Sequence, residues 1–272
     1  MKQQLKKITP TPLWKLGSDA YWWYHNRGRH RLAQAFDRTW AASQYRLESY
    51  RNAHANERCF ILGNGPSLLR TDLSLLRNEF TFGLNRIYLL FPELGFPTTF
   101  LVSVNELVLE QCATEIAGLD LPKFVTWRAR RWFEADPGTI FLDTDFTGPE
   151  NFSSEATQRL FEGHTVTFVA LQLAFFMGFT NVILVGVDHN FETKGPVNLV
   201  VTSEGDDPNH FTPGYFGKGF RWQLPDLQGS ERAYWLAKAA FEAASRQVRD
   251  ATIGGKLSIF PKVNYPSLFP EK

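Results

Sequence analysis

The stretch CFILGNGPS at residues 59–67 decides the fold. Its first four residues are apolar, as in a short strand that is buried on both faces of a sheet. A glycine-rich turn follows at once, in the way that a parallel strand passes into a helix. The glycines allow a tight turn and a close backbone approach, while Ser67 and the amide groups after it can donate to an anionic oxygen. This turn is therefore the first candidate binding loop.

The spacing of the turn disfavours two common phosphate-binding motifs. No Gly-Lys-Ser or Gly-Lys-Thr follows Ser67, so the turn is not a Walker loop. The glycines also do not continue as Gly-x-Gly-x-x-Gly. A P-loop site or a dinucleotide site is therefore disfavoured.

Strands and helices alternate along the rest of the chain. Further strands are expected at residues 81–84, 99–104, 124–127, 139–142 and 181–187. Residues 165–179 form an apolar helix that Gly178 ends, and residues 230–248 form a last helix with Ser230 as its cap. Apolar strands with helices on either side belong in a parallel sheet that is covered on both faces. The sequence therefore predicts an α/β fold, a Rossmann-like and mostly parallel sheet with helices on both faces.

A basic helical arm is expected to precede this domain. Residues 1–58 hold eleven Lys or Arg against four Asp or Glu, whereas the remainder holds 18 basic and 24 acidic residues. Aromatic and aliphatic side chains recur every three to five residues up to residue 56, which indicates two amphipathic helices. We expect an arm at residues 1–56 and a catalytic domain at residues 57–272. The arm either meets an anionic membrane surface, through Trp22, Trp23 and its arginines, or packs on its own domain.

Composition limits the remaining classes. The chain has 43% hydrophobic and 21% charged residues, so it folds. The body has no basic stripe of the kind that nucleic acid requires, and its two cysteines make no disulfide framework or metal cluster. No signal peptide and no apolar run of about 20 residues is visible. We expect a cytoplasmic protein, peripheral at the inner membrane if the arm binds there.

Polar residues follow four of the expected strands. Asn64, Asn85, Asn105 and Asp188 each stand at a strand end. Since ligands bind at the carboxyl ends of parallel strands, these side chains should converge. Asparagine offers both donors and acceptors, which suits ribose hydroxyls and the edge of a base. The alternative is that each asparagine merely ends its strand.

A polar stretch with Gly and Pro at residues 192–227 is too long for a simple connection, so it is a candidate lid. It contains His210 and, five residues later, Tyr215. A histidine can exchange a proton near neutral pH, so His210 is the candidate general base, with Tyr215 as a phosphate contact. Alternatively, His210 is an ordinary loop residue.

Several of these segments together resemble one superfamily. They are FILGNGPSL at 60–68, FGLNRIY at 82–88, VGVD at 185–188 and NHF at 209–211. The superfamily includes bacterial sialyltransferases that use CMP-sialic acid, motility accessory factors that modify flagellin, and the MptE-like 6-hydroxymethylpterin pyrophosphokinases. The resemblance covers roughly residues 57–265.

The resemblance implies roles for particular residues. In the sialyltransferases the corresponding asparagines bind the CMP donor, and the turn before the buried helix contributes cytidine and phosphate contacts. The general base there is the second histidine of His-Tyr-x-Gly-His, whereas here the first aligns with His210 and the second falls on Gly214. The expected donor-binding set is Gly63, Asn64, Gly65, Ser67, Asn85, Asn105, Thr165, Thr167 and Asp188. The expected catalytic pair is His210 and Tyr215.

The function expected from residues and resemblance is that of a transferase in polysaccharide biosynthesis. It would move a sugar from a nucleotide donor, in the first place CMP-linked, to a surface glycan or a lipid-linked acceptor, without a required cofactor or metal ligand. The alternative enzyme is an ATP-dependent pyrophosphokinase that needs Mg²⁺ held by Asp188 with Asp143 or Asp145. A second alternative is a non-catalytic nucleotide-binding module at the membrane. Whether the chain forms a homo-oligomer is left open.

Overall fold

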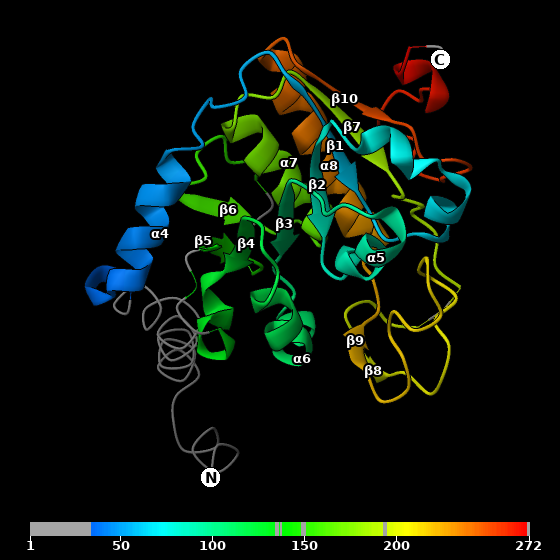
Figure 1. The fold of residues 1–272 in the computed structure, drawn as a ribbon, viewed down its shortest axis with the longest axis horizontal. Helices are drawn as coiled ribbons and strands as arrows, with labels where there is room; N and C mark the ends of the chain where they lie inside the picture. The colour runs from blue at the N-terminus through cyan, green and yellow to red at the C-terminus, as the bar shows by residue number, and fades with distance from the viewer. Residues whose placement is uncertain (1–33, 134–135, 137, 148–150, 193–194, 271–272) are drawn as a thin grey trace, which may run out of the picture. The chain divides into compact units, whose positions relative to one another are not determined.

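The computed structural model describes residues 34–133, 136, 138–147, 151–192 and 195–270. Residues 43–272 form one compact unit, built on a sheet of eight strands in the described residues. These strands are β1 (Arg58–Leu62), β2 (Phe80–Leu84), β3 (Phe100–Ser103), β4 (Lys123–Thr126), β5 (Thr139–Asp145), β6 (Arg159–Phe161), β7 (Asn181–Val185) and β10 (Gln247–Asp250). Their order is β10-β7-β1-β2-β3-β4-β5-β6, and every described pair is parallel (Figure 1). The expected parallel Rossmann-like sheet is confirmed.

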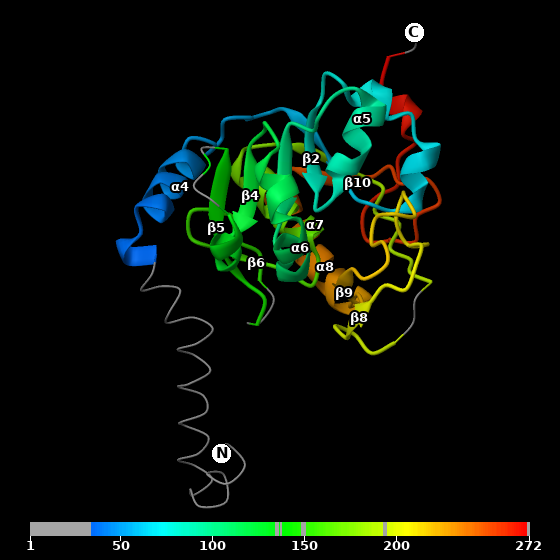
Figure 2. The same cartoon turned by 60° about the horizontal axis from the view of Figure 1, so that its bottom comes forward.

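The chain reverses its direction of travel across the sheet next to β1. From β1 to β6 it moves steadily one way, and then α7 (Val166–Phe176) carries it back to β7 on the other side of β1. Since such crossovers are right-handed, the reversal places α7 and α8 (Leu227–Ala243) on the face opposite to α5 (Phe91–Leu94) and α6 (Glu106–Ala117) (Figure 2). Loops that leave on opposite faces open a crevice at this point.

Short 3-10 turns replace helices in several connections. They are η2 (Pro66–Arg70), η3 (Leu73–Leu76), η4 (Ile87–Leu90), η5 (Trp127–Trp132) and η6 (Pro266–Leu268). Asp72 caps η3 by accepting a hydrogen bond from the Ser74 amide. The connections that follow β1, β2 and β4 are therefore compact, which keeps polar residues close to the strand ends.

The apolar core lies between α7 and the sheet. Most residues of α7 are buried, because the helix crosses beneath β1, β2 and β3 on its way to β7. The segment at 43–56, which the sequence groups with the arm, also packs here. Leu47 is fully buried, the Asn52 amide donates to Phe176, and the His54 ring stacks on Phe179 at 4.7 Å. These residues thus share the compact unit with the sheet.

Both boundaries of the last helix differ from the prediction. The last helix begins at Leu227 because Asp226, not Ser230, accepts the hydrogen bond of the Gly229 amide. It ends at Ala243, since Gln247–Asp250 extends beside β7 as strand β10. The sequence pattern misses β10 because QVRD carries only one apolar residue. The pattern also misses β6, which is three residues long.

The expected lid contains a small sheet of its own. Strands β8 (Val200–Thr202) and β9 (Arg221–Gln223) pair antiparallel, and β9 lies beside α6 in both views (Figures 1 and 2). The Gln111 amide group of α6 donates to the Arg221 carbonyl and accepts from the Arg221 amide. The lid is therefore attached to the sheet domain by hydrogen bonds between the Gln111 side chain and the Arg221 backbone.

The proposed membrane residues of the arm, Trp22, Trp23 and the arginines from Arg27 to Arg31, lie outside the described residues. Helix α4 (Arg38–Glu48) is the described part of the two helices expected there. In the part of the chain that the structure describes, no helix has both the length and the apolar composition needed to cross a bilayer.

Candidate functional site

A cavity of about 770 Å³ lies at the carboxyl ends of the strands. The loop after β1, the ends of β2, β3, β5 and β7, the start of α7 and the lid all contribute to its wall. Nine of the expected site residues line it: Gly63, Asn64, Gly65, Asn85, Asn105, Thr165, Thr167, Asp188 and His210. Ser67 and Tyr215 are buried and do not line the cavity. The convergence predicted from strand ends is therefore observed for Asn64, Asn85, Asn105 and Asp188.

Each of the three asparagines at the cavity has one polar group that makes no hydrogen bond to a described residue. Asn64 donates through Nδ2 to the Leu84 carbonyl, and its buried Oδ1 has no hydrogen-bond partner among the described residues. Asn85 and Asn105 accept through Oδ1, the first from the Ser103 hydroxyl and the second from two amides of α6, which it caps. The protein thus holds all three side chains through one half of each amide, and the other half, one buried acceptor and two NH₂ groups, has no partner among the described residues.

Asn85 also adopts a left-handed backbone conformation, with φ of 48°. His164, His189 and Asn198, which line the same cavity, have φ values of 63°, 53° and 61°. Such conformations cost energy for residues other than glycine and are concentrated at functional sites. This strain is consistent with the cavity as a binding site.

Asp188 holds the glycine-rich loop in place through hydrogen bonds. Its carboxylate accepts from the Ser67 hydroxyl at 2.7 Å and from the Ser67 amide at 3.3 Å. The Gly63 and Gly65 amides donate to the carbonyls of Val185 and Gly186. Ser67 is therefore not available to an external anion, and this corrects the sequence-based expectation for its hydroxyl and amide.

The glycines of the loop are required by packing against β7. A Cβ at Gly63 would lie 2.2 Å from the Gly186 carbonyl oxygen, and one at Gly65 would lie 1.8 Å from an Asp188 carboxylate oxygen. The close approach that the sequence indicates is thus an approach to the neighbouring strand end rather than to a ligand.

The N-terminus of α7 also faces the cavity. Thr165 caps this helix of 11 residues and Thr167 follows in its first turn. Backbone amides at a helix N-terminus and the positive end of the helix dipole attract anions. Thr165 Oγ1 lies 3.4 Å from the hydroxyl of Tyr234 on α8, which also lines the cavity. This end of α7 is therefore a candidate site for an anionic group of a ligand.

His210 is held by a carboxylate. Its Nδ1 lies 2.6 Å from Oδ2 of Asp207, whose side chain is 3% exposed. Asp207 in turn accepts from the Asn209 amide, and the Phe211 amide donates to the Asn64 carbonyl. The lid thus fixes the ring next to the glycine-rich loop. With Nδ1 on a carboxylate, Nε2 is the ring nitrogen that can accept a proton.

Tyr215 supports the His210 ring from behind. The two rings stack at 4.0 Å with an interplanar angle of 9°, and Tyr215 is fully buried. Its hydroxyl accepts from the Arg86 amide at 3.4 Å, and its carbonyl accepts from the Arg86 guanidinium. Burial raises the pKa of Tyr215, so the phenol stays neutral. This placement does not fit the phosphate contact expected from the sequence, because the hydroxyl faces Arg86 and not the cavity.

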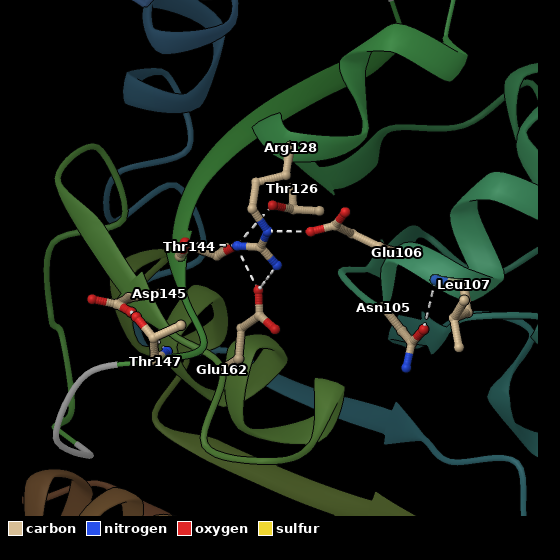
Figure 3. Close-up of polar contacts among 9 residues, drawn as sticks. All are labelled: Asn105, Glu106, Leu107, Thr126, Arg128, Thr144, Asp145, Thr147 and Glu162. Carbon is tan, nitrogen blue, oxygen red and sulfur yellow. Dashed lines mark hydrogen bonds and ion pairs between the residues drawn. The ribbon is translucent and has the colours of Figure 1, made fainter. Parts of the chain in front are cut away.

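The sequence-based reasoning missed a charged cluster beyond Asn105. Arg128, at the end of β4, donates to Glu106 and to Glu162 at 2.6 Å each (Figure 3). It also donates to the backbone and side-chain oxygens of Thr144. Burial acts to lower the pKa of Arg128, but the glutamates outweigh it and raise that pKa. Glu106 directly follows the strand-end residue Asn105. It would have been found if the residue after each strand-end asparagine had also been considered.

Two further histidines pair with acids at the cavity wall. His164 Nδ1 lies 3.3 Å from Asp226, and His189 Nε2 lies 3.0 Å from Glu231. A Cβ at Gly229 would lie 2.5 Å from the His164 ring, so the glycine at the start of α8 makes room for this histidine. Sequence spacing alone does not reveal these pairs, because their partners lie in the last helix and the turn before it.

The Mg²⁺ ligands expected for a pyrophosphokinase do not come together. Asp188 follows β7, whereas Asp143 and Asp145 lie on β5, and four strands separate the two. At about 4.8 Å per strand the two strands are about 24 Å apart, which is too far for their carboxylates to share one ion. Asp143 and Asp145 instead pair with Arg159. Among the described residues, no group of three or more His, Cys, Asp or Glu is arranged to hold a metal ion.

Comparisons with known proteins add one finding on the fold. No protein-family model and no curated protein matches the chain. Among solved structures, the fold is similar to that of the MAf glycosyltransferase from Magnetospirillum magneticum AMB-1, with a TM-score of 0.50 and 15% identity. The match covers 84% of this chain but 39% of that protein, so the chain spans well under half of its length.

Proposed function

We propose that the chain is a glycosyltransferase that moves a sugar from a nucleotide donor to a hydroxyl of a surface glycan or a lipid-linked acceptor. The observation that best supports this proposal is the Asp207–His210 pair. It places a carboxylate-bound imidazole in the wall of the cavity beside the strand-end asparagines. The fold similarity to the MAf glycosyltransferase is in keeping with this class of enzyme.

In this proposal the nucleotide lies over the ends of β1, β2 and β3. Asn64 Oδ1 accepts from the base or ribose, while the Nδ2 groups of Asn85 and Asn105 donate. The phosphate lies at the N-terminus of α7 near Thr165 and Thr167, where amides and the helix dipole favour an anion. We propose CMP as the nucleotide, on the basis of the sequence resemblance to sialyltransferases that use CMP-sialic acid.

His210 acts as the general base in the transfer step. Nε2 takes the proton of the acceptor hydroxyl, the acceptor oxygen bonds to the anomeric carbon, and the bond from that carbon to the donor phosphate breaks. The nucleotide leaves with the bonding electron pair. Asp207 stabilises the imidazolium that forms, as a carboxylate does for a histidine base in hydrolases.

The binding test is thermal unfolding of the full chain with CMP or ATP, each with and without Mg²⁺. We expect CMP to raise the melting temperature without Mg²⁺. Asn64→Ala should weaken CMP binding by about 1–3 kcal/mol, because it removes a buried acceptor. Asn78→Ala, at an exposed turn, is the matched control. Stabilisation by ATP that needs Mg²⁺ would favour a kinase, and no response to either nucleotide would contradict a nucleotide site.

The catalytic test is His210→Ala. We expect turnover to fall by roughly 10² to 10⁴ with nearly unchanged donor affinity, because the lost interaction develops in the transition state. A loss of donor affinity with turnover retained would make His210 a binding residue instead.

We also propose that residues 1–56 bring the chain to an anionic membrane surface, on the cytoplasmic side, where a lipid-linked acceptor would be found. The support for this proposal is the excess of basic residues in that segment.

A further inference from the structure

The far end of the cavity, beyond Asn105, has a chemical character of its own. Glu106, Arg128, Phe146 and Glu162 line it, after the ends of β4, β5 and β6 and at the start of α6. The proposed base and nucleotide site make no use of these side chains. We call this end of the cavity the Arg128 subsite.

Each nitrogen of the Arg128 guanidinium donates to the protein. Nε donates to Glu106, one terminal nitrogen donates to Glu162, and the other donates to Thr144 (Figure 3). Its side chain is 11% exposed. Arg128 therefore serves to position the two glutamates.

Both glutamates keep one oxygen for a ligand. Each binds Arg128 through Oε1, and no described residue makes a hydrogen bond to Oε2 of either. Glu106 is 39% exposed and Glu162 is 14% exposed at their side chains. An ionised carboxylate only accepts hydrogen bonds, so the matching partner is a hydroxyl or another donor.

Phe146 adds an apolar surface beside these acceptors. Its ring covers Arg128, with the guanidinium carbon 4.5 Å from the ring centroid, and Phe146 is 53% exposed. Phe161, which also lines the cavity, is half-buried. An aromatic face next to carboxylate acceptors matches a sugar ring, which has apolar C–H faces and hydroxyl groups at its edge.

The negative charge of the cavity wall disfavours a sugar that carries a carboxylate. Among the described residues, its wall carries five carboxylates, of Glu106, Asp145, Glu162, Asp188 and Asp226. Arg128 is the single guanidinium in that wall, and no described lysine lines it. A ligand carboxylate at the Arg128 subsite would meet two glutamates without a free cation, and like charges at close range are unfavourable.

We infer that the Arg128 subsite binds an uncharged, hydroxyl-rich sugar ring and rejects a ring that carries a carboxylate. Glu106 and Glu162 accept from the ring hydroxyls, and Phe146 packs on its C–H face. The inference rests on the proposed glycosyl transfer, for which it defines the class of sugar. The ring is either that of the acceptor or that of the donor, and the experiment separates the two.

The experiment measures binding of matched sugars to the full chain by saturation-transfer NMR. The first pair is methyl β-D-glucopyranoside and methyl β-D-glucopyranosiduronate, which differ only in a hydroxymethyl against a carboxylate group. The second pair is methyl β-D-galactopyranoside and methyl β-D-galactopyranosiduronate. We expect the uncharged member of at least one pair to bind about tenfold or more tightly than the charged member.

Variants then test the residues. Glu106→Gln and Glu162→Gln keep the side-chain shape and should each reduce the discrimination severalfold, whereas Phe146→Ala should weaken the uncharged sugar. Glu242→Gln, at an exposed position of α8, is the matched control. Glu106 is well exposed, so its variant remains informative even if Glu162→Gln unfolds the protein. Equal binding of both members, no binding in either pair, or unchanged discrimination in the folded variants would overturn the inference.

Two further measurements show whether the sugar belongs to the donor or to the acceptor, and they separate this inference from the proposed function. If UDP-glucose binds more tightly than UDP-glucuronate, the subsite takes the donor sugar and the donor nucleotide is not CMP. Discrimination confined to the free glycosides assigns the subsite to the acceptor. CMP binding is measured in parallel. If CMP does not bind but the glycosides are discriminated, the proposed donor is wrong and the subsite stands. If CMP binds and the glycosides are not discriminated, the subsite alone fails.

Discussion

His210 depends on two neighbours for its position in the cavity wall. Asp207 binds Nδ1 at 2.6 Å, and Tyr215 stacks on the ring at 4.0 Å. Arg86 in turn holds the hydroxyl and the carbonyl of Tyr215. The His210 ring, the proposed base, is therefore oriented by a chain of contacts that starts after β2. A change at one of these neighbours should act through the ring.

Asp207→Asn tests this orientation at the scale of one residue. The amide keeps the shape but loses the charge that stabilises the imidazolium, so we expect turnover to fall by about 10- to 100-fold with donor affinity unchanged. Long-range ¹H–¹⁵N NMR should show the Nδ1–H form of His210 in the parent and a mixture of forms in the variant. Asp206→Asn, at the exposed neighbouring position, is the control. An unchanged spectrum and unchanged turnover would remove Asp207 from the mechanism.

The loops after β1 and β7 form one structural unit at the scale of the elements. Gly63 and Gly65 press against the end of β7, and Asp188 binds Ser67 across the gap. Asn64, between the two glycines, owes its position to this contact. The binding loop is consequently only as rigid as its junction with the neighbouring strand.

Gly65→Ala tests the junction. The new Cβ would lie 1.8 Å from an Asp188 oxygen. Either the hydrogen bonds between Asp188 and Ser67 must break or the loop must shift. We expect a loss of about 1–3 kcal/mol in the free energy of unfolding, as for an overpacked site. CMP binding should weaken as well. The measurements are urea denaturation and titration with CMP.

Gly205→Ala is the matched control for this prediction. A Cβ there meets no atom within 4 Å, so its effect on both quantities should be small. If the two alanine variants behave alike, the loop is not held by the contact with β7.

At the scale of the whole molecule, the compact unit extends further towards the N-terminus than the charge pattern indicates. It begins at Ser43, and the chain after α4 packs beneath the sheet. Tyr50 meets Phe100 and Phe124 edge-on, with ring centroids 5.8 Å and 5.6 Å away. Residues 43–56 therefore contribute to the stability of the unit.

Two truncations test this contribution. Deletion of residues 1–42 should leave the free energy of unfolding nearly unchanged. Deletion of residues 1–56 should lower it by more than the roughly 2–5 kcal/mol typical of losing one buried leucine, because Leu47 and Tyr50 are both removed. The check is urea denaturation of both proteins. Equal stability of the two would place residues 43–56 outside the folded unit.

The shorter truncation also tests the membrane proposal. The full chain should sediment with anionic vesicles, and the chain without residues 1–42 should not, because most of the basic residues of the arm are gone. Sedimentation of both proteins would mean that the membrane contact lies elsewhere.

Local sequence alone determined much of the sheet. Apolar runs such as CFIL and NVILV predict buried parallel strands, because a strand covered on both faces needs apolar side chains on both sides. The polar residue after each run marks the carboxyl edge, so the meeting of Asn64, Asn85, Asn105 and Asp188 was predictable as well. The position of His210 in a long polar segment indicated its place near that edge.

Tertiary structure alone decided which groups remain free for a ligand. Ser67 appears available in sequence but is bound to Asp188, which is 121 positions away, and Tyr215 is turned towards Arg86. Arg128 meets Glu162 across 34 positions because β4, β5 and β6 are neighbours. Periodicity reports which residues are buried in one element. Hydrogen-bond partners depend on how distant elements are brought together, and that pairing is set by the packing of the whole sheet.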